Sequence, residues 1–302
     1  MKLIVFINLM LPLILLLLGG VIARRCLQVE AKPLSKLTLY LLSPALVFNS
    51  LVRSDLAGFE LLKLAFGTVA LILGLSFLVS LLGYLLGWSP RLVSAMKLGA
   101  VFTNVGNYSL PIIVSLFGNA GLERVAVIIV AHQLLMCSLA VYFAARSHFG
   151  AWRSFTALLR MPTAYAALAA LVWRQQPAVP PQFLLQTTGL LAQAALPIFL
   201  LLLGVQLSGA TISPMPGLLC LGSLIKLAAS PVWAAILALG LGLEQLSGYV
   251  LILAAAAPTA IVTTMLAIEF NAEPELVSSL TLCTTLLSLA SVPLVISALG
   301  LT

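Results

Sequence analysis

The chain has 302 residues, of which 62% are hydrophobic and 8% are charged, and its formal net charge is +7. Soluble domains carry roughly 25% charged residues, so this composition excludes an ordinary soluble fold. Long Leu, Ala, Val and Ile runs without alternation also exclude a membrane β-barrel. We therefore expect an all-α membrane protein embedded in a lipid bilayer. The basic residues lie in connecting segments, which is a topology signal, so no nucleic-acid partner is expected.

Ten apolar segments approach the roughly 20 residues that a membrane-crossing helix needs. They are 3–23, 34–53, 60–87, 92–118, 122–145, 161–174, 181–207, 216–240, 247–269 and 275–299. The first resembles a signal peptide, but it runs without a cleavage pattern into two arginines and is interpreted as the first span. The stretch 146–160 is predicted to be a cytoplasmic linker.

The positive charges between the spans are divided unequally between the two sides of the membrane. One side carries Arg24, Arg25, Lys32, Lys36, Arg91, Lys97, Arg146, Arg153 and Arg160. The other carries Lys2, Arg53, Lys63, Arg124 and Arg174. The side that is richer in Lys and Arg faces the cytoplasm. The sequence therefore predicts a multi-pass protein of the plasma (inner) membrane with both termini outside the cytoplasm.

Two prolines interrupt apolar segments at corresponding places in the two halves of the chain. The first ends the run NVGNYSLP, at Pro111, and the second lies in the run AAAAPTA, at Pro258. Proline has no N–H, and its ring clashes with the carbonyl four residues earlier. We therefore expect each helix to break at its proline. Leu110 should leave the helical conformation, and each second half-helix should begin at the proline.

A second pair of prolines, Pro44 and Pro197, occupies the second and seventh spans. The two pairs predict two related five-helix repeats, 1–145 and 161–302. Because five is an odd number, the second repeat must be inserted upside down. Inverted repeats with paired broken helices in spans four and nine are typical of secondary transporters.

The two half-helix N-termini are expected to converge on one region, where free N–H groups and the helix dipoles suit an anion. Polar side chains beside the breaks are costly in hydrocarbon unless they are satisfied. A site role is favoured for Asn104 and Asn107. For the threonines after the second break, hydrogen bonding to the backbone of the broken helix is slightly favoured. Lys226, within the eighth span, either neutralises an anion or bonds carbonyls structurally. The predicted substrate-binding residues are Asn104, Asn107, Tyr108, Pro111, Pro258, Thr259 and Lys226.

Coupling to Na⁺ or H⁺ would involve His132, Gln133 and Thr263, although a neutral packing role for the histidine is favoured. All carboxylates fall in loops or near span ends, so no carboxylate proton relay or carboxylate-based sodium site is expected. The chain has no Walker motif and no cysteine spacing typical of a metal site. No cofactor and no bound metal are therefore predicted.

Three stretches resemble the auxin efflux carrier family, which includes plant auxin exporters and bacterial malate or malonate carriers. The first is the Asn104–Pro111 run, with an asparagine seven residues before a proline. The second combines APTAIV at 257–262 with EFNAEPEL at 269–276, and the third is SVPL at 291–294. The resemblance covers nearly the whole chain in length and span order.

The resemblance implies an arrangement like that of sodium–proton antiporters and bile-acid transporters, with spans four and nine crossing at the site. It implies a scaffold part, about 1–53 and 161–207, and a transport part, about 60–145 and 216–299, which moves like an elevator. It also implies a homodimer, and it makes Asn104 the substrate-binding asparagine. The chain departs from the plant proteins in lacking their long cytoplasmic loop between spans five and six.

The sequence thus predicts a carrier for a small organic anion and not an enzyme, and the family resemblance implies that the anion is a carboxylate. Two alternatives stay open: a sodium- or proton-coupled cation carrier on a related fold, and a membrane sensor that has lost transport. An intramembrane enzyme ranks last, because no catalytic grouping of acids, histidines or serines lies at membrane depth.

Overall fold

The computed structural model describes residues 2–54, 56–145, 162–175, 180–208 and 215–301. The predicted linker 146–160 lies outside these residues. The described chain is helical throughout and contains no strand. The all-α prediction is therefore confirmed for the part of the chain that is described.

The helices of the described residues, in chain order, are α1 (Lys2–Leu27), α2 (Ala31–Leu37), α3 (Ser43–Val52), α4 (Gly58–Leu85), α5 (Pro90–Ala100), α6 (Leu110–Leu135), α7 (Val141–Ala145), α9 (Pro162–Arg174), α10 (Gln182–Leu207), α11 (Pro216–Leu224), α12 (Ser230–Gly240), α13 (Gln245–Ala256), α14 (Ile261–Glu269) and α15 (Pro274–Ala298). Short π-helical turns join some of them: η1 (Thr38–Leu42), η2 (Val105–Ser109), η3 (Met136–Ala140) and η4 (Ile225–Ala229).

Six helical stretches in the described chain are long and apolar enough to cross a membrane. They are Ala31–Val52, Gly58–Leu85, Val105–Ala144, Gln182–Gln206, Pro216–Gly240 and Pro274–Ala298. The third is bent at Gly118, whose φ of 58° and ψ of −141° are not helical, so the chain turns where the fourth and fifth spans were separated. Large apolar side chains such as Phe66 and Leu239 lie exposed on the outside, as lipid contact requires.

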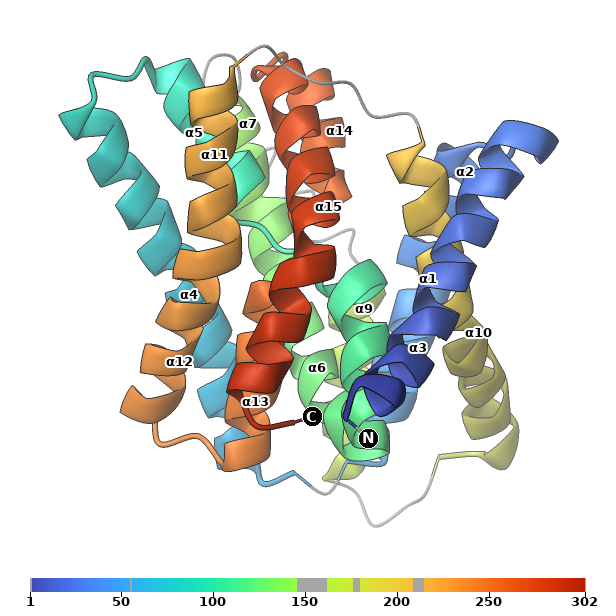
Figure 1. Cartoon of the computed structure of the whole chain (residues 1–302). Coiled ribbons are helices and arrows are strands. Elements are labelled where there is room, and N and C mark those ends of the chain that lie inside the picture. Colours follow the sequence, from blue (N-terminus) through green and yellow to red (C-terminus); the bar gives the residue numbers. More distant parts are fainter. Residues whose placement is uncertain (1, 55, 146–161, 176–179, 209–214, 302) are drawn as a thin grey trace.

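Two groups of helices lie on opposite sides of Figure 1. On one side α1 and α3 pack against α10, and on the other α4 and α13 pack against α12. Gly20 and Gly204 bring α1 and α10 into backbone contact, since a Cβ on Gly204 would lie 1.9 Å from the carbonyl oxygen of Leu17. Small residues commonly allow such close approach between membrane helices.

The first predicted break is displaced from Pro111. Leu110 keeps helical angles (φ −54°, ψ −51°), and η2 continues directly into α6, so the expectation of a break at this proline is wrong. The helix instead ends at Ala100, and the unwound stretch is 101–104. The π-helical turn explains the difference. Its wider hydrogen-bonding pattern passes over the missing N–H and moves the preceding turn away from the proline ring.

A π-helical turn before a proline also occurs elsewhere in the chain. Turn η1 ends one residue before Ser43-Pro44, and η4 ends one residue before Ser230-Pro231. In these places, as at Pro111, the proline follows a π-helical turn and the helix continues. At these three prolines a wide turn therefore takes the place of an interruption.

The second break is where the sequence placed it. Helix α13 ends at Ala256, and Ala257 is extended (φ −66°, ψ 155°), as expected for a residue before proline. Helix α14 begins at Ile261 rather than at Pro258, so the unwound stretch is 257–260. Both breaks lie among buried residues, where the released backbone groups need partners inside the protein.

Candidate functional site

The two unwound stretches cross and pair with each other. Thr103 and Thr259 form an isolated antiparallel bridge. The Asn104 N–H donates to the Pro258 carbonyl at 2.9 Å, and the Ala260 N–H donates to the Phe102 carbonyl at 3.0 Å. In Figure 1, α5 and α13 approach this crossing from opposite ends of the bundle. The pairing gives the buried polar backbone the partners that hydrocarbon cannot supply.

Thr103 of the first unwound stretch is bonded through both its backbone and its side chain. Its N–H donates to Nε2 of His132 at 3.0 Å, and its Oγ1 receives a hydrogen bond from Nζ of Lys226 at 2.5 Å. The histidine ring also packs edge-on against Phe102, with the ring centroids 6.0 Å apart. Since Nε2 accepts this hydrogen bond, it carries no proton in this arrangement.

Thr259 has the matching position in the second unwound stretch. Its N–H donates to Oγ1 of Thr284 at 3.1 Å, and its hydroxyl donates to the Gly99 carbonyl at the end of α5. Thr259 is fully buried. These bonds tie the second break to α15 and to the carbonyl end of the first broken helix.

A cavity of about 460 Å³ lies beside the crossing. One wall is formed by the first residues of the two helices that follow the breaks: Val105, Gly106 and Asn107 of η2, with Ile261 and Val262 of α14. The N–H groups of a helix's first turn have no partner inside the helix, and the dipole is positive there. Two such ends therefore meet at one cavity, which favours an anion.

Two buried polar atoms of this cavity have no hydrogen-bond partner. They are Nδ2 of Asn104, a side chain that is 6% exposed, and Oε1 of Gln206 on α10. The Nε2 of Gln206 is held by Ser35 of α2 at 3.1 Å. Buried polar atoms are almost always hydrogen-bonded, so an unpaired donor and an unpaired acceptor lining one cavity indicate a place for a polar ligand.

The other residues singled out from the sequence separate into two sets. Asn107, His132 and Gln133 line the cavity together with Asn104. The remaining ones are not among its lining residues: Tyr108, Pro111, Pro258, Thr259, Thr263 and Lys226.

Each residue of the second set has a structural contact of its own. The Tyr108 hydroxyl bonds Ser288 of α15 at 2.8 Å. Thr263 bonds back to the Ala260 carbonyl at 2.6 Å, in the first turn of α14. Pro111 is buried in the first turn of α6, and Pro258 contributes its carbonyl to the crossing.

The cavity is bordered by charged side chains at one end of the bundle. Lys32 and Lys36 of α2 line it, and both are exposed. Glu269, the last residue of α14, is the one carboxylate among the described residues of the lining. The nearby charge is thus mainly positive and water-accessible, which would attract an anion to the cavity.

Sequence reasoning did not single out Thr103, Gln206 or Ser35. A glutamine within an apolar span is a signal that could have found Gln206, because such a residue is expensive in hydrocarbon. Thr103 directly precedes Asn104, but nothing in its sequence neighbourhood distinguishes it from the many other hydroxyl residues. Its role depends on the antiparallel bridge with Thr259.

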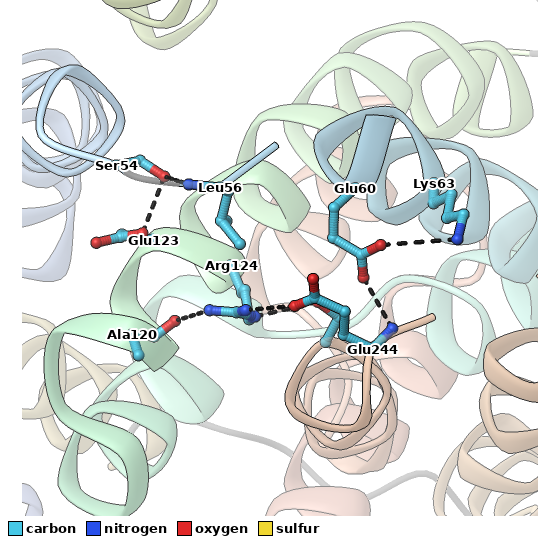
Figure 2. A network of polar contacts seen from close by, with 9 residues as sticks. Ser54, Leu56, Glu60, Lys63, Ala120, Glu123, Arg124 and Glu244 are labelled. Carbon is cyan, nitrogen blue, oxygen red and sulfur yellow. Dashed lines mark hydrogen bonds and ion pairs between the residues drawn. The ribbon is translucent and has the colours of Figure 1, made fainter. Parts of the chain in front are cut away.

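A second polar network lies at the opposite end of the bundle (Figure 2). Nη2 of Arg124 bonds Oε2 of Glu244 at 2.9 Å, and its Nε bonds Ser247 at 3.1 Å. Oε1 of Glu60 accepts the Glu244 N–H at 3.0 Å, which satisfies backbone just before α13. This network connects α4, α6 and α13 and does not touch the cavity.

Ser54 extends this end of the molecule toward α3. Its hydroxyl donates to Oε2 of Glu123 at 2.9 Å and accepts the Leu56 N–H at 3.2 Å (Figure 2). Arg174, the last residue of α9, donates to the Leu56 carbonyl. The carboxylates of this end therefore bind polar groups of helix termini and connecting segments.

Comparison with known proteins gives the class of the molecule. Residues 152–296 match the family described as "Membrane transport protein". Over 271 residues the chain is 29% identical to an "Uncharacterized transporter" of Methanothermobacter thermautotrophicus, and the match covers 88% of each protein. Together with the apolar helices, these matches indicate a multi-pass integral membrane protein that is similar to membrane transporters.

Proposed function

We propose that the protein is a secondary carrier that moves a small organic anion, most simply a carboxylate, across the plasma membrane. The observation that carries this proposal is the unpaired Nδ2 of Asn104 in a cavity where two helix N-termini meet. A carboxylate there would accept hydrogen bonds from the amide and from free backbone N–H groups. Gln206 would accept a hydrogen bond from a donor group elsewhere on the substrate.

The proposed architecture is ten membrane-spanning helices in two inverted five-helix repeats. Three observations support it: the opposite directions of α5 and α13, the antiparallel pairing of Thr103 with Thr259, and the bend at Gly118. Lys32 and Lys36 border the cavity on the side that the charge count assigns to the cytoplasm. In this proposal both termini face outward, and the cavity is the inward-facing entrance.

The proposed movement is an elevator-type exchange of access. Helices α1, α2, α3, α9 and α10 would form the scaffold, and the remaining helices would carry the crossing past it. Gln206 and Ser35 belong to the proposed scaffold, whereas Asn104 belongs to the moving part. A substrate held between them would therefore exchange its scaffold contacts as the crossing moves, which is how alternating access would release it.

The test is binding and flux with one matched pair of variants. Purified protein is screened by thermal shift against small mono- and dicarboxylates and aromatic acids, because a bound ligand raises the Tm by mass action. Ligands that raise the Tm are then measured for uptake into liposomes. Asn104→Ala should abolish both responses. Asn49→Ala should keep both, since Asn49 bonds Leu185 and Thr188 away from the cavity.

Two results would contradict the proposal in different ways. Binding and flux that are unchanged in Asn104→Ala would remove the site assignment. Specific binding that depends on Asn104, without flux in liposomes, would favour a sensor over a carrier.

A further inference from the structure

A buried lysine without a carboxylate partner lies behind the crossing. Lys226 is 0% exposed and belongs to the π-helical turn η4. Its Nζ donates to Thr103 Oγ1 at 2.5 Å and to the Val101 carbonyl at 3.5 Å. It is not among the residues that line the cavity, so its contacts are with the unwound stretch and not with a ligand in that space.

No ion pair neutralises this side chain within the described residues. The ion pairs found there join Lys63 with Glu60, Arg91 with Glu273, and Arg124 with Glu244. An isolated charge in a low-dielectric interior is costly, so it needs dipoles that favour it. Val101 directly follows α5, and the carbonyl end of a helix carries the negative end of its dipole. Lys226 is thus placed where a positive charge is stabilised.

The carbonyl end of the other broken helix is satisfied differently. Ser230, four residues after Lys226 on the same helix, donates to the Ala255 carbonyl at 3.0 Å near the end of α13. Ser109 donates to the Leu253 carbonyl at 3.3 Å. Residues four apart lie on one helix face, so one face of the α11–η4–α12 helix reaches both breaks. It offers a cation to the first and a neutral hydroxyl to the second.

Carbonyl and hydroxyl oxygens at the end of a half-helix are the groups that bind a coupling cation in carriers with broken helices. At the end of α5 these groups are the Val101 carbonyl and the Thr103 hydroxyl, and both are bonded by Lys226. We propose that Lys226 is a resident cation of the crossing, supplying from a side chain the positive charge that a bound Na⁺ would otherwise supply. Anion binding therefore needs no sodium.

In this role Lys226 is a positioning residue that acts through Thr103. The lysine fixes the hydroxyl, and His132 fixes the backbone N–H of the same threonine. These two contacts hold the unwound stretch that presents Asn104 to the cavity. That anion binding and uptake need no sodium rests on the proposed function. That Lys226 acts as the cation of the crossing does not, because it concerns the stability of the crossing itself.

The test measures Tm for the full-length protein in NaCl, LiCl, methylammonium chloride and choline chloride at constant ionic strength. Wild type should have the same Tm in all four salts. Lys226→Ala should lose about 5 °C or more in choline, because buried carbonyl and hydroxyl oxygens lose their donor. Small cations should restore about half of that loss in a saturable manner, as a ligand does.

Two matched variants separate charge from packing. Lys226→Met fills the space without a charge, and it should show the same loss with no response to small cations. Ser230→Ala removes a neutral donor from the same helix face, and it should lower the Tm slightly with no cation response. Uptake of the anion by wild type should be equal in sodium and in choline.

The inference is overturned if Lys226→Met keeps the wild-type Tm, if Lys226→Ala ignores all three small cations, or if wild type itself gains Tm or uptake from sodium. Failure of the proposed function would be distinguishable. In that case no anion would bind wild type, while the cation response of Lys226→Ala would remain.

Discussion

The crossing and the network of Figure 2 satisfy their charges in different ways. At the crossing, a fully buried lysine bonds a threonine hydroxyl and a backbone carbonyl. At the opposite end, Arg124 bonds Glu244, whose side chain is 59% exposed. The buried arginine thus has an exposed carboxylate as its partner, whereas the buried lysine bonds neutral oxygens. The reason is that a second buried charge adds a desolvation cost that a dipole does not.

The difference bears on what each region does. An ion pair with a water-exposed partner contributes little and weakens in salt, so the Arg124–Glu244 pair orders helix ends without contributing much to stability. The residues of the crossing are buried, so water does not readily replace a lost partner and each of their hydrogen bonds matters more. The same argument applies to the cavity. A ligand bound there would give its unpaired amide groups the hydrogen-bond partners that they lack.

The largest effect is expected from Asn104→Asp, which brings carboxylate chemistry to the crossing. A negative charge beside the anion should lower uptake about 100-fold or more, since like charges at a binding site cost several kcal/mol. Uptake into liposomes is the measurement. Uptake within about threefold of wild type, measured on folded protein, would show that the anion binds elsewhere.

Thr103→Val should produce the next largest effect, on stability. The substitution keeps the shape of the side chain but removes the acceptor for Lys226, at a cost of about 1–3 kcal/mol. The matched control is Thr285→Val, because Thr285 is equally buried but bonds only the Thr281 carbonyl of its own helix. Thermal unfolding should separate the two variants clearly. Equal Tm values would mean that the lysine contact does not stabilise the crossing.

Arg124→Gln tests the outer network and should cost about 1 kcal/mol. Glu244 loses its arginine partner, but the exposed carboxylate can be hydrated again. The difference from wild type should shrink in about 1 M salt, where the screening length falls to about 3 Å. The deficit of Thr103→Val should not change in the same salt. A salt-independent Arg124→Gln deficit would remove the contrast between the two regions.

The smallest change is expected for Glu244→Gln, at about 0.5 kcal/mol or less. Its exposed side chain contributes one partner to Arg124, and the arginine keeps Ser247 and the Ala120 carbonyl. Tm measured at low and high salt is the test. A loss larger than that of Arg124→Gln would mean that the network depends on the carboxylate and not on the arginine.

Several features of the fold could be read from the chain before its structure was known. Composition identified the membrane class, because 62% hydrophobic residues cannot be hidden in a soluble domain of this size. The break near Pro258 was predictable, since the helical conformation is disfavoured for the residue before a proline, and Ala257 is extended. The break near Pro111 was misplaced by several residues, because a π-helical turn accommodated that proline and the chain unwound at 101–104 instead.

The candidate site could likewise be predicted only in part from the sequence. Asn104 and Asn107 stand out in the sequence because a side-chain amide at membrane depth is costly unless it is hydrogen-bonded. The structure places both residues at the cavity. The contacts of Lys226 could not be foreseen, since a lysine in an apolar span is compatible with a ligand, a carboxylate or a carbonyl as its partner. The unpaired Oε1 of Gln206 could be connected with Asn104 only once the structure showed that both line one cavity.

The sequence by itself determined that this protein lies in a lipid bilayer. It also determined which residues are too polar to lie in hydrocarbon without a partner. These are local matters of hydropathy and backbone chemistry, which each segment carries with it. Only the tertiary structure decided which half-helix faces which, because Thr103 meets Thr259, and Lys226 meets Val101, through contacts between segments more than 120 residues apart. Such pairings depend on how whole helices pack, and no single segment encodes them.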